Sequence, residues 1–311
     1  MKPTLQKAAP HIRRGLSSRD VMLDVLIACL PMSIGGVWNF GWRALWVILV
    51  SVVTCGLCDE IGNRLRGQRV FDGSGLVTGV LLALCLPAGV PFWALILAGI
   101  FSVAVVKQIP GGVGRNIFNP AMAGRAFLMI AFPQTVTGFT RADALSSATP
   151  LSHVHMQPSV LSMLFGFENG SIGETSVVLI LVGGIYLYLR GRISLRVPVT
   201  CLGVFALFVW MWGGAIPFTG PVTAHLFSGG LMLGAFLYVT DFTSKPTTPA
   251  GEYIFAGGVG LLTAVLRLWG RYPEGICFAI LLMNLAAPFL EYLTRRRVYG
   301  IATKKEIRPQ V

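Results

Sequence analysis

Residues 42–58 read WRALWVILVSVVTCGLC and contain a single charged side chain, Arg43. A transmembrane helix needs about 20 mainly apolar residues, so this stretch has nearly the length and the composition of one membrane span. The rest of the chain has the same character: 54% of its 311 residues are hydrophobic and only 12% are charged, against about 25% charged in an average soluble domain. This composition excludes a disordered chain, a coiled coil and an ordinary soluble globule.

Nine further apolar segments accompany this one along the chain. The sequence therefore predicts an all-α polytopic membrane protein with about ten transmembrane helices in one domain, residues 21–293. Polar, basic segments flank the domain at residues 1–20 and 294–311. The third and fifth segments are short and bounded by glycine or proline, which predicts broken or re-entrant helices. The ten segments lie near residues 21–37, 42–58, 74–88, 91–108, 117–132, 175–190, 197–213, 223–241, 252–269 and 273–293.

The basic residues are distributed unevenly among the predicted connections. With the N-terminus inside, one side of the membrane carries 20 Lys and Arg residues. The positive-inside rule then predicts that both termini are cytoplasmic and that the longest connection, residues 133–174, is extracytoplasmic. The net charge of +12 is thus explained by membrane orientation and does not indicate nucleic-acid binding. The opposite side carries only Arg43, Arg141, Arg267 and Arg271.

Parts of the two halves of the sequence resemble each other. Residues 71–81 are similar to residues 255–266 with one insertion, and residues 114–124 are loosely similar to residues 275–288. Two halves of five spans each must have opposite orientations in the membrane, and such inverted repeats place a binding site or path at their interface. The alternative is that membrane helices rich in Gly, Leu and Thr look alike by composition.

The extracytoplasmic connection contains the sequence DALSSATPL, residues 143–151. The residue before a proline is held in an extended conformation, so Thr149 cannot lie inside a regular helix. Its small neighbours leave the hydroxyl accessible, which suits covalent modification by an enzyme that reads an extended peptide. A plain turn is the alternative interpretation.

Five motifs together resemble those of a known family of membrane electron carriers. Over residues 71–284 the chain is similar to the D-type component of the Rnf electron-transport complex. That component is a homologue of the B-type component of the sodium-pumping NADH:quinone oxidoreductase. The motifs are FDGSGLVTG (71–79), GGVGRNIFNPA (111–121), SATPL (147–151), TDFTSKPTTP (240–249) and YPEGICFAILLMN (272–284).

This resemblance implies a cofactor. In the family, FMN is attached to a threonine through a phosphoester, and the matching position is Thr149. Asp143, Ser146 and Ala148 match positions that the flavin transferase recognises. Ser147 stands where the family often has glycine, a small change that should not block attachment. Related proteins can also hold a non-covalent riboflavin within the bundle.

The resemblance further implies a role in a complex of the bacterial cytoplasmic (inner) membrane. The complex moves electrons between ferredoxin and NAD⁺ and couples this reaction to translocation of Na⁺ or H⁺. The chain has no NAD site or cluster ligands of its own, so partners of the A, B, C, E and G types would supply them. Two other interpretations stay open: a channel or facilitator for a small neutral solute, and an assembly scaffold without a cofactor.

A few polar residues inside or beside the apolar segments are further candidates. Asn119 before Pro120 predicts the start of a helix inside the membrane, which could face a flavin or an anion. Arg125 lies well inside a segment, so we expect it to be paired or to contact a phosphate or flavin ring. Asp72 and Asp241 lie in Gly- or Thr-rich breaks and are the preferred candidates for a cation path. Other acids near segment ends are Asp24, Asp59 and Glu60.

The cysteine and histidine residues do not predict a metal site. All six cysteines lie in apolar segments, and Cys55 and Cys58 form one close pair where an iron–sulfur cluster needs four thiolates. His153 and His155 lie beside the Thr149 motif without a cysteine or a second histidine pair nearby. We therefore expect that no metal ion is bound by this chain.

Overall fold

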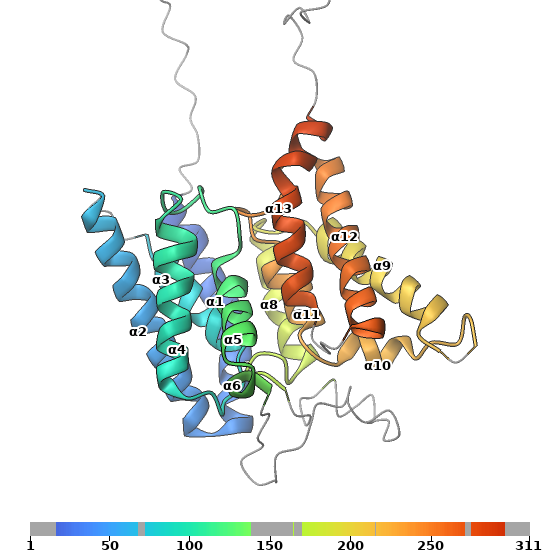
Figure 1. Ribbon diagram of the computed structural model, residues 1–311, viewed down its shortest axis with the longest axis horizontal. Helices are drawn as coiled ribbons and strands as arrows, with labels where there is room; N and C mark the ends of the chain where they lie inside the picture. The colour runs from blue at the N-terminus through green and yellow to red at the C-terminus, as the bar shows by residue number, and fades with distance from the viewer. Residues whose placement is uncertain are drawn as a thin grey trace, which may run out of the picture.

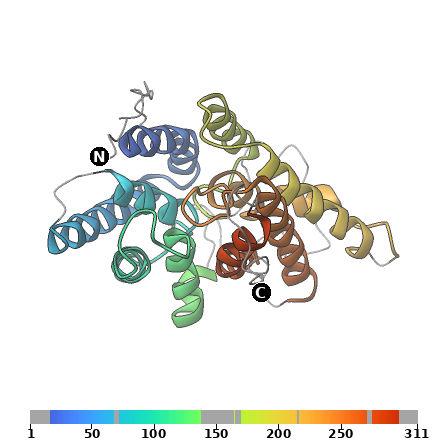
Figure 2. The same cartoon turned by 90° about the horizontal axis from the view of Figure 1, so that it is seen from above.

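The computed structural model describes residues 17–67, 72–137, 164, 170–214, 216–270 and 275–295. Every regular element in these ranges is a helix, so the predicted all-α class is confirmed for the part of the chain that the structure describes. The helices lie side by side and form one bundle (Figure 1). Figure 2 shows residues 18–137 on one side of the bundle and residues 177–295 on the other.

Four helices are long and apolar enough to cross a membrane: α1 (Ser18–Phe40), α2 (Trp42–Leu65), α12 (Pro249–Trp269) and α13 (Ile276–Thr294). They contain 19 to 24 residues. At 1.5 Å per residue, helices of this length match the hydrocarbon core of about 30 Å. Four such helices confirm the predicted membrane character of the chain, whereas the count of ten spans stays a prediction.

The remaining helices are shorter. In the first half they are α3 (Ser74–Leu84), α4 (Phe92–Ile100), which continues as the π-helix η1 (Phe101–Gln108), α5 (Pro120–Ala131) and α6 (Pro133–Thr137). In the second half they are α8 (Val177–Leu189), α9 (Arg196–Trp212), α10 (Val222–Phe227), α11 (Leu231–Leu233) and the π-helix η3 (Gly234–Tyr238).

The two helices predicted to be short are short in the structure. Helix α3 has 11 residues and α5 has 12, which gives each a length of about 17 Å, roughly half of the hydrocarbon core. Neither can cross the core alone, and the residues at their starts, Ser74 and Asn119, are buried. Asn119 is the N-cap of α5, as predicted, and its side chain accepts hydrogen bonds from the backbone N–H groups of Ala121 and Met122 at 3.1 and 3.3 Å.

Small residues let the helices of each half approach closely. The Ser51 hydroxyl on α2 donates to the Gly79 carbonyl on α3 at 2.7 Å. A Cβ atom added at Gly79 would lie 2.6 Å from the Val52 Cα, so only glycine fits at this contact. Close backbone contact at small residues is the usual way in which membrane helices associate, because lipid provides no hydrophobic drive between them.

The two described ends of the chain lie on the same face of the bundle. In Figure 1 the start of α1 and the end of α13 are at the top, whereas α6 is at the bottom. Thr247, just before α12, donates to Glu291 near the end of α13 at 2.7 Å, which places both at the same face. We call this the terminal face and the opposite one the outer face. The terminal face carries Arg19, Arg64, Arg190, Arg192, Arg196 and Arg295, a distribution that agrees with the predicted sidedness.

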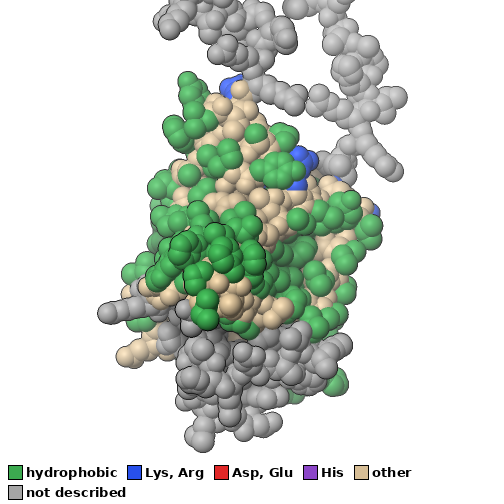
Figure 3. All heavy atoms as spheres, turned by 90° about the vertical axis from the view of Figure 1, so that its right-hand side faces the viewer, with side chains coloured by type: hydrophobic (Ala, Val, Ile, Leu, Met, Phe, Trp, Pro, Cys, Tyr) green, Lys and Arg blue, Asp and Glu red, His purple; other side chains and the backbone are tan. Residues whose placement is uncertain are grey.

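The outward sides of the helices are apolar. Figure 3 shows hydrophobic side chains over the face formed by α9, α10 and α12, with the visible Lys and Arg side chains toward the terminal face. Val199, Leu207, Trp210 and Trp269 are among the exposed residues there. Such a surface is suited to contact with lipid.

Candidate functional site

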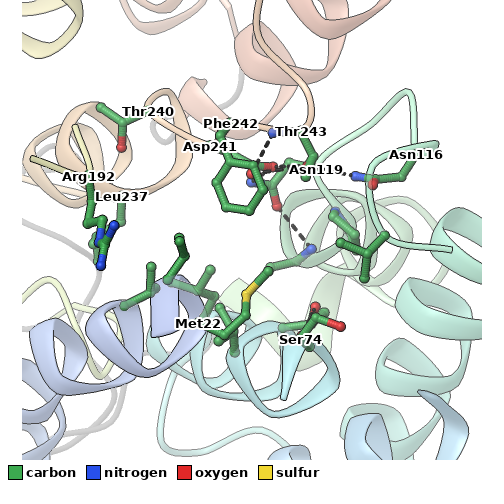
Figure 4. A pocket seen from close by; sticks show the side chains of 18 of the residues that line it. Met22, Ser74, Asn116, Asn119, Arg192, Leu237, Thr240, Asp241, Phe242 and Thr243 are labelled. Carbon is green, nitrogen blue, oxygen red and sulfur yellow. Dashed lines mark hydrogen bonds between the residues drawn. The ribbon is translucent and has the colours of Figure 1, made fainter. Parts of the chain in front are cut away.

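A small cavity, lined mostly by apolar side chains, lies between the two halves of the bundle, toward the terminal face (Figure 4). Its volume is about 90 Å³. The starts of α3 and α5, the end of η1, the loop after α8 and the loop after η3 all contribute to it. Its polar lining consists of Ser74, Thr78, Lys107, Asn116, Asn119, Arg192, Thr240, Asp241 and Thr243.

One wall of the cavity is formed by a cluster at the start of α3. Lys107 on η1 is only 3% exposed, and its ammonium group lies 2.8 Å from the Asp59 carboxylate. The ammonium also donates to the Ser74 hydroxyl at 2.6 Å. The same hydroxyl donates to Asp72 at 2.6 Å, and Asp72 accepts the Ser74 backbone N–H at 3.0 Å. Asp72 thus caps the first turn of α3 after Gly73, whose φ of +76° only glycine adopts readily.

The opposite wall is formed by Asp241 and the start of α5. The Asp241 carboxylate accepts from the Thr243 backbone N–H at 3.1 Å and from the Ser244 hydroxyl at 2.9 Å. It also accepts from the Asn119 amide at 3.4 Å. In the orientation that satisfies both of its neighbours, the Asn284 amide of α13 donates to the Ser244 carbonyl and accepts from the Asn119 N–H. Asn119 and Asp241, predicted separately, therefore meet at one site.

The predicted acids do not have equal access to the cavity. Asp241 is half-buried and lines it, whereas Asp72 contacts it only through Ser74. Figure 4 shows Ser74 across the cavity from Asp241 and Asn119. The cavity therefore has one carboxylate directly in its wall and two more, those of Asp59 and Asp72, behind the Ser74 hydroxyl. Oxygen atoms of this kind, from carboxylate, hydroxyl and amide groups, suit a hard cation or ordered water.

The volume limits what the cavity can hold. About 90 Å³ is room for several water molecules, but pockets for organic ligands are typically about 300–1,000 Å³. The cavity as it stands is therefore suited to water or a small ion.

Arg125 lies elsewhere, in the outer half of the bundle. Its guanidinium Nη1 donates to the Glu174 carboxylate at 3.1 Å, and both side chains are almost fully buried. Asn119 and Arg125 are six residues apart on α5, or about 9 Å along the helix. Asn119 and Arg125, both predicted as flavin or phosphate contacts, therefore lie at different places. Asn119 lies at the cavity near the terminal face, which we call the inner cavity, and Arg125 lies in an ion pair nearer the outer face.

The proposed attachment motif lies outside the described residues. This applies to Asp143, Ser146, Ala148 and Thr149, and to His153 and His155. The nearest described residues on either side of it are Thr137, at the end of α6 on the outer face, and Leu164.

Comparison with known proteins places the chain in a family. Residues 5–300 match the family described as NQR2, RnfD, RnfE. The chain belongs to this family. A similar relative is the D-type component of the proton-translocating ferredoxin:NAD⁺ oxidoreductase complex of Clostridium ljungdahlii, with 36% identity over 94% of this chain and 95% of the relative.

Two further relatives carry related names. The D-type component of the Na⁺-translocating ferredoxin:NAD⁺ oxidoreductase complex of Acetobacterium woodii is 39% identical over 96% of each chain. The D-type component of the ion-translocating oxidoreductase complex of Stutzerimonas stutzeri is 35% identical over 90% of this chain and 91% of the relative. The matched members of the family are thus named as parts of ion-translocating oxidoreductases, which confirms the resemblance found in the sequence.

Several charged pairs in the structure were not predicted from the sequence. Asp24 on α1 accepts from Arg190 at 3.0 Å and from Arg192 at 2.6 Å, and thereby links α1 to the loop after α8. Asp59 was expected only as one of several acids near segment ends, without a partner, yet it pairs with the buried Lys107. In the sequence, each of these charged residues stands inside or beside an apolar segment. This position indicates that the residue has a partner but does not identify the partner.

The described residues include no group of three or more His, Cys, Asp or Glu side chains that could hold a metal ion. All six cysteines are free, and Cys55 and Cys58 both lie on α2. Cys55 is fully buried against the Gly99 carbonyl. This geometry favours a packing role for the cysteine pair.

Proposed function

We propose that this chain is the D-type membrane component of an ion-translocating ferredoxin:NAD⁺ oxidoreductase and that it carries FMN on Thr149 through a phosphoester. Family membership, the names of the relatives and the motif at residues 143–151 support this proposal. Bound FMN would supply one- and two-electron redox chemistry. Asp143, Ser146 and Ala148 serve recognition by the flavin transferase, which acts before the complex functions.

We further propose that the inner cavity forms part of the route for Na⁺ or H⁺. The observation that carries this step is the Asp241 carboxylate, which lines a cavity large enough for water between two helix starts inside the bundle. A carboxylate at such a position offers a cation a place to lose part of its hydration shell. Asp72 supports the site indirectly, because it orients Ser74 beside Lys107.

Asp241→Asn tests this route. We expect coupled ion transport to fall about tenfold or more, because one charged interaction of this kind is worth roughly 1.5–3 kcal/mol. The flavin content should stay unchanged. Transport is measured in proteoliposomes of the purified complex, with Asp20→Asn as the matched control, since Asp20 caps α1 at the exposed terminal face.

The two acids are expected to differ. Asp72→Asn keeps an oxygen that can cap α3 and should reduce transport less than Asp241→Asn. Full transport by the Asp241 variant would exclude this carboxylate from the route.

We propose that the terminal face is cytoplasmic and that the protein resides in a bacterial inner membrane. The distribution of arginine and lysine between the two faces supports this orientation. In a background with Cys58, the half-buried cysteine, replaced by alanine, a cysteine at position 159 should react with an impermeant thiol reagent in spheroplasts. Arg64→Cys, at the exposed end of α2, should react only after the membrane is opened. The reverse pattern would overturn the orientation.

The proposed assembly includes the other membrane and peripheral components, of the A, B, C, E and G types in the family resemblance. They would bind NAD⁺ and the iron–sulfur clusters. We also propose that the chain crosses the membrane ten times and that its spans form two inverted repeats of five helices. A solute channel has no need of a flavin, so the flavin measurement described in the Discussion separates the two functions.

A further inference from the structure

An apolar groove runs along α5, between this helix and η1, and we call it the α5 groove. Its volume is about 600 Å³, and the stacked rings of Phe101 and Phe127, 4.6 Å apart, form part of its wall. Its lining includes Phe118, just before α5, and Ala131, the last residue of the helix. The twelve residues of α5 span about 17 Å, which is close to the depth of one leaflet in a hydrocarbon core of about 30 Å.

Several apolar side chains that line the α5 groove stay exposed. Val105 on η1 is 43% exposed, Ile117 in the loop before α5 is 49% exposed and Ile130 on α5 is 71% exposed. A continuous apolar surface of this kind marks contact with lipid or with another protein. The polar groups at the ends of the groove decide between these occupants.

The end of the groove toward the terminal face is formed by a loop rich in glycine. This loop leads from η1 to α5 and lies at the terminal face (Figure 1). It supplies Pro110, Ile117 and Phe118 to the groove, and it also contains Arg115. The apolar groove and a basic residue therefore belong to the same ten-residue stretch.

Two arginine side chains pack on neighbouring glycines of this loop. A Cβ atom added at Gly111 would lie 2.6 Å from the Arg115 Cδ and 3.3 Å from its Nη1. A Cβ atom added at Gly112 would lie 2.5 Å from Nη2 of Arg66, the residue that ends α2. The φ angles of Gly111 and Gly112, +126° and +93°, also require glycine. The loop thus brings two guanidinium groups to the end of the groove.

The described residues do not neutralise these two charges. Arg66 donates to the uncharged amide oxygen of Asn63 at 2.8 Å, and Arg115 is exposed. Neither arginine takes part in an ion pair with any described residue. Basic groups between membrane helices at the cytoplasmic surface suit the head groups of anionic lipids, and arginine binds phosphate oxygens in pairs.

We infer that this chain binds an anionic phospholipid, with its phosphate at Arg115 and Arg66 and one acyl chain in the α5 groove. A zwitterionic lipid neutralises its own phosphate, so it matches two unpaired arginines less well. A membrane helix of a partner would fill the groove but would leave the arginines without an anion. The inference does not depend on the flavin at Thr149.

The bound lipid would also support the inner cavity. Asn116, in the same loop, lines that cavity and donates to the Thr243 hydroxyl at 3.1 Å. A lipid that holds the loop against η1 and α5 would therefore hold one wall of the cavity in place.

The test measures binding of dioleoylphosphatidylglycerol, an anionic phospholipid, to the full-length chain purified in detergent. Native mass spectrometry gives the bound fraction over a titration. Arg115→Gln should weaken binding about fivefold, the usual contribution of one basic residue near anionic lipid, whereas Arg115→Lys should weaken it less. Dioleoylphosphatidylcholine, which has the same acyl chains and no net charge, should bind the wild-type chain more weakly.

Arg19→Gln is the matched control. Arg19 lies in the first turn of α1, is exposed at the terminal face and is remote in sequence from the groove. Its substitution removes the same charge, so binding should stay within about twofold of the wild type. This control separates a defined site from general attraction between anionic lipid and a basic surface.

A second arm tests the groove through the length of the acyl chain. Ala131 is exposed and lines the end of the groove nearer the outer face, so Ala131→Phe fills this end without burying a new side chain in the core. The variant should bind dioleoylphosphatidylglycerol more weakly than the wild type does. It should bind dioctanoylphosphatidylglycerol as well as the wild type does, because the shorter chains do not reach the substituted end.

Three results would overturn the inference. The first is equal binding of dioleoylphosphatidylglycerol by the wild type, Arg115→Gln and Arg19→Gln. The second is displacement of the lipid by sodium phosphate with no effect of Ala131→Phe, which would indicate a site for a free anion only. The third is a cross-link from a maleimide–benzophenone reagent on Ile117→Cys, in a Cys58→Ala background, to another component of the purified complex, which would show that a partner covers the groove.

Discussion

Thr149→Val is expected to abolish covalent flavin on this chain. A phosphoester requires the side-chain oxygen, and valine replaces the hydroxyl with a methyl group of similar volume. The change therefore removes the chemistry while leaving the shape of the motif almost intact. Because the motif is not part of the described helical core, the α-helical content and the Tm of the flavin-free protein should change little.

The measurement is mass spectrometry of the tryptic peptide covering residues 142–190, from protein made in its native host or together with a flavin transferase. This peptide contains Thr149 and ends at Arg190, with no internal Lys or Arg. Thr135→Val, the same substitution on α6 at the outer face, should retain the modification, whereas removal of Asp143 should impair it. An unmodified Thr149 in wild-type protein from the native host would defeat the electron-carrier proposal.

Glu174→Gln is expected to destabilise the fold by about 3–5 kcal/mol, because it removes one partner of a buried ion pair. The substitution deprives the buried Arg125 guanidinium of the carboxylate with which it pairs. Glutamine is close to glutamate in size, so the loss reflects charge and not a cavity.

Glu60→Gln is the matched control for this change. Glu60 pairs with Arg64 at 2.7 Å, a shorter distance than that of the Arg125–Glu174 pair, but the two side chains are 33% and 74% exposed. Exposed helix pairs of this kind contribute only about 0.3–0.5 kcal/mol. Both variants are unfolded with denaturant in detergent micelles while helix content is followed by circular dichroism. Equal losses in the two variants would show that burial does not govern the strength of the Glu174 pair.

Features that depend only on residues close together along the chain could be predicted from the sequence. The apolar runs predicted membrane helices, and α1, α2, α12 and α13 lie where segments were expected. The glycine and proline residues around the third and fifth segments predicted that α3 and α5 would be short. Asn119 before Pro120 predicted the start of α5 within about one turn. Each of these predictions rests on local backbone preferences or on the transfer of side chains into lipid, which a linear pattern records.

Other local features were missed for identifiable reasons. Residues 223–241 were expected to form one segment, but the structure divides them into α10, α11 and η3. The apolar run is interrupted by three small residues, Ser228, Gly229 and Gly230. The mean hydropathy of the segment stays high in spite of them, so it does not reveal the break. The covalent flavin depends on a family resemblance, because the composition of residues 143–151 would fit a plain turn equally well.

The partners of the buried polar groups become known only from the folded arrangement. Arg125 was expected to need a partner, but that partner, Glu174, is 49 residues away, and Asn119 meets Asp241 across 122 residues. The linear pattern of residues was enough to predict a membrane protein, its main helical segments and the side of the membrane on which most basic residues lie. Which helices touch depends on where small residues allow backbones to approach, as at Gly79 against Val52. Such contacts form between surfaces made by distant segments, so the cavity at Asp241 and the buried Arg125–Glu174 pair exist only once the helices have packed.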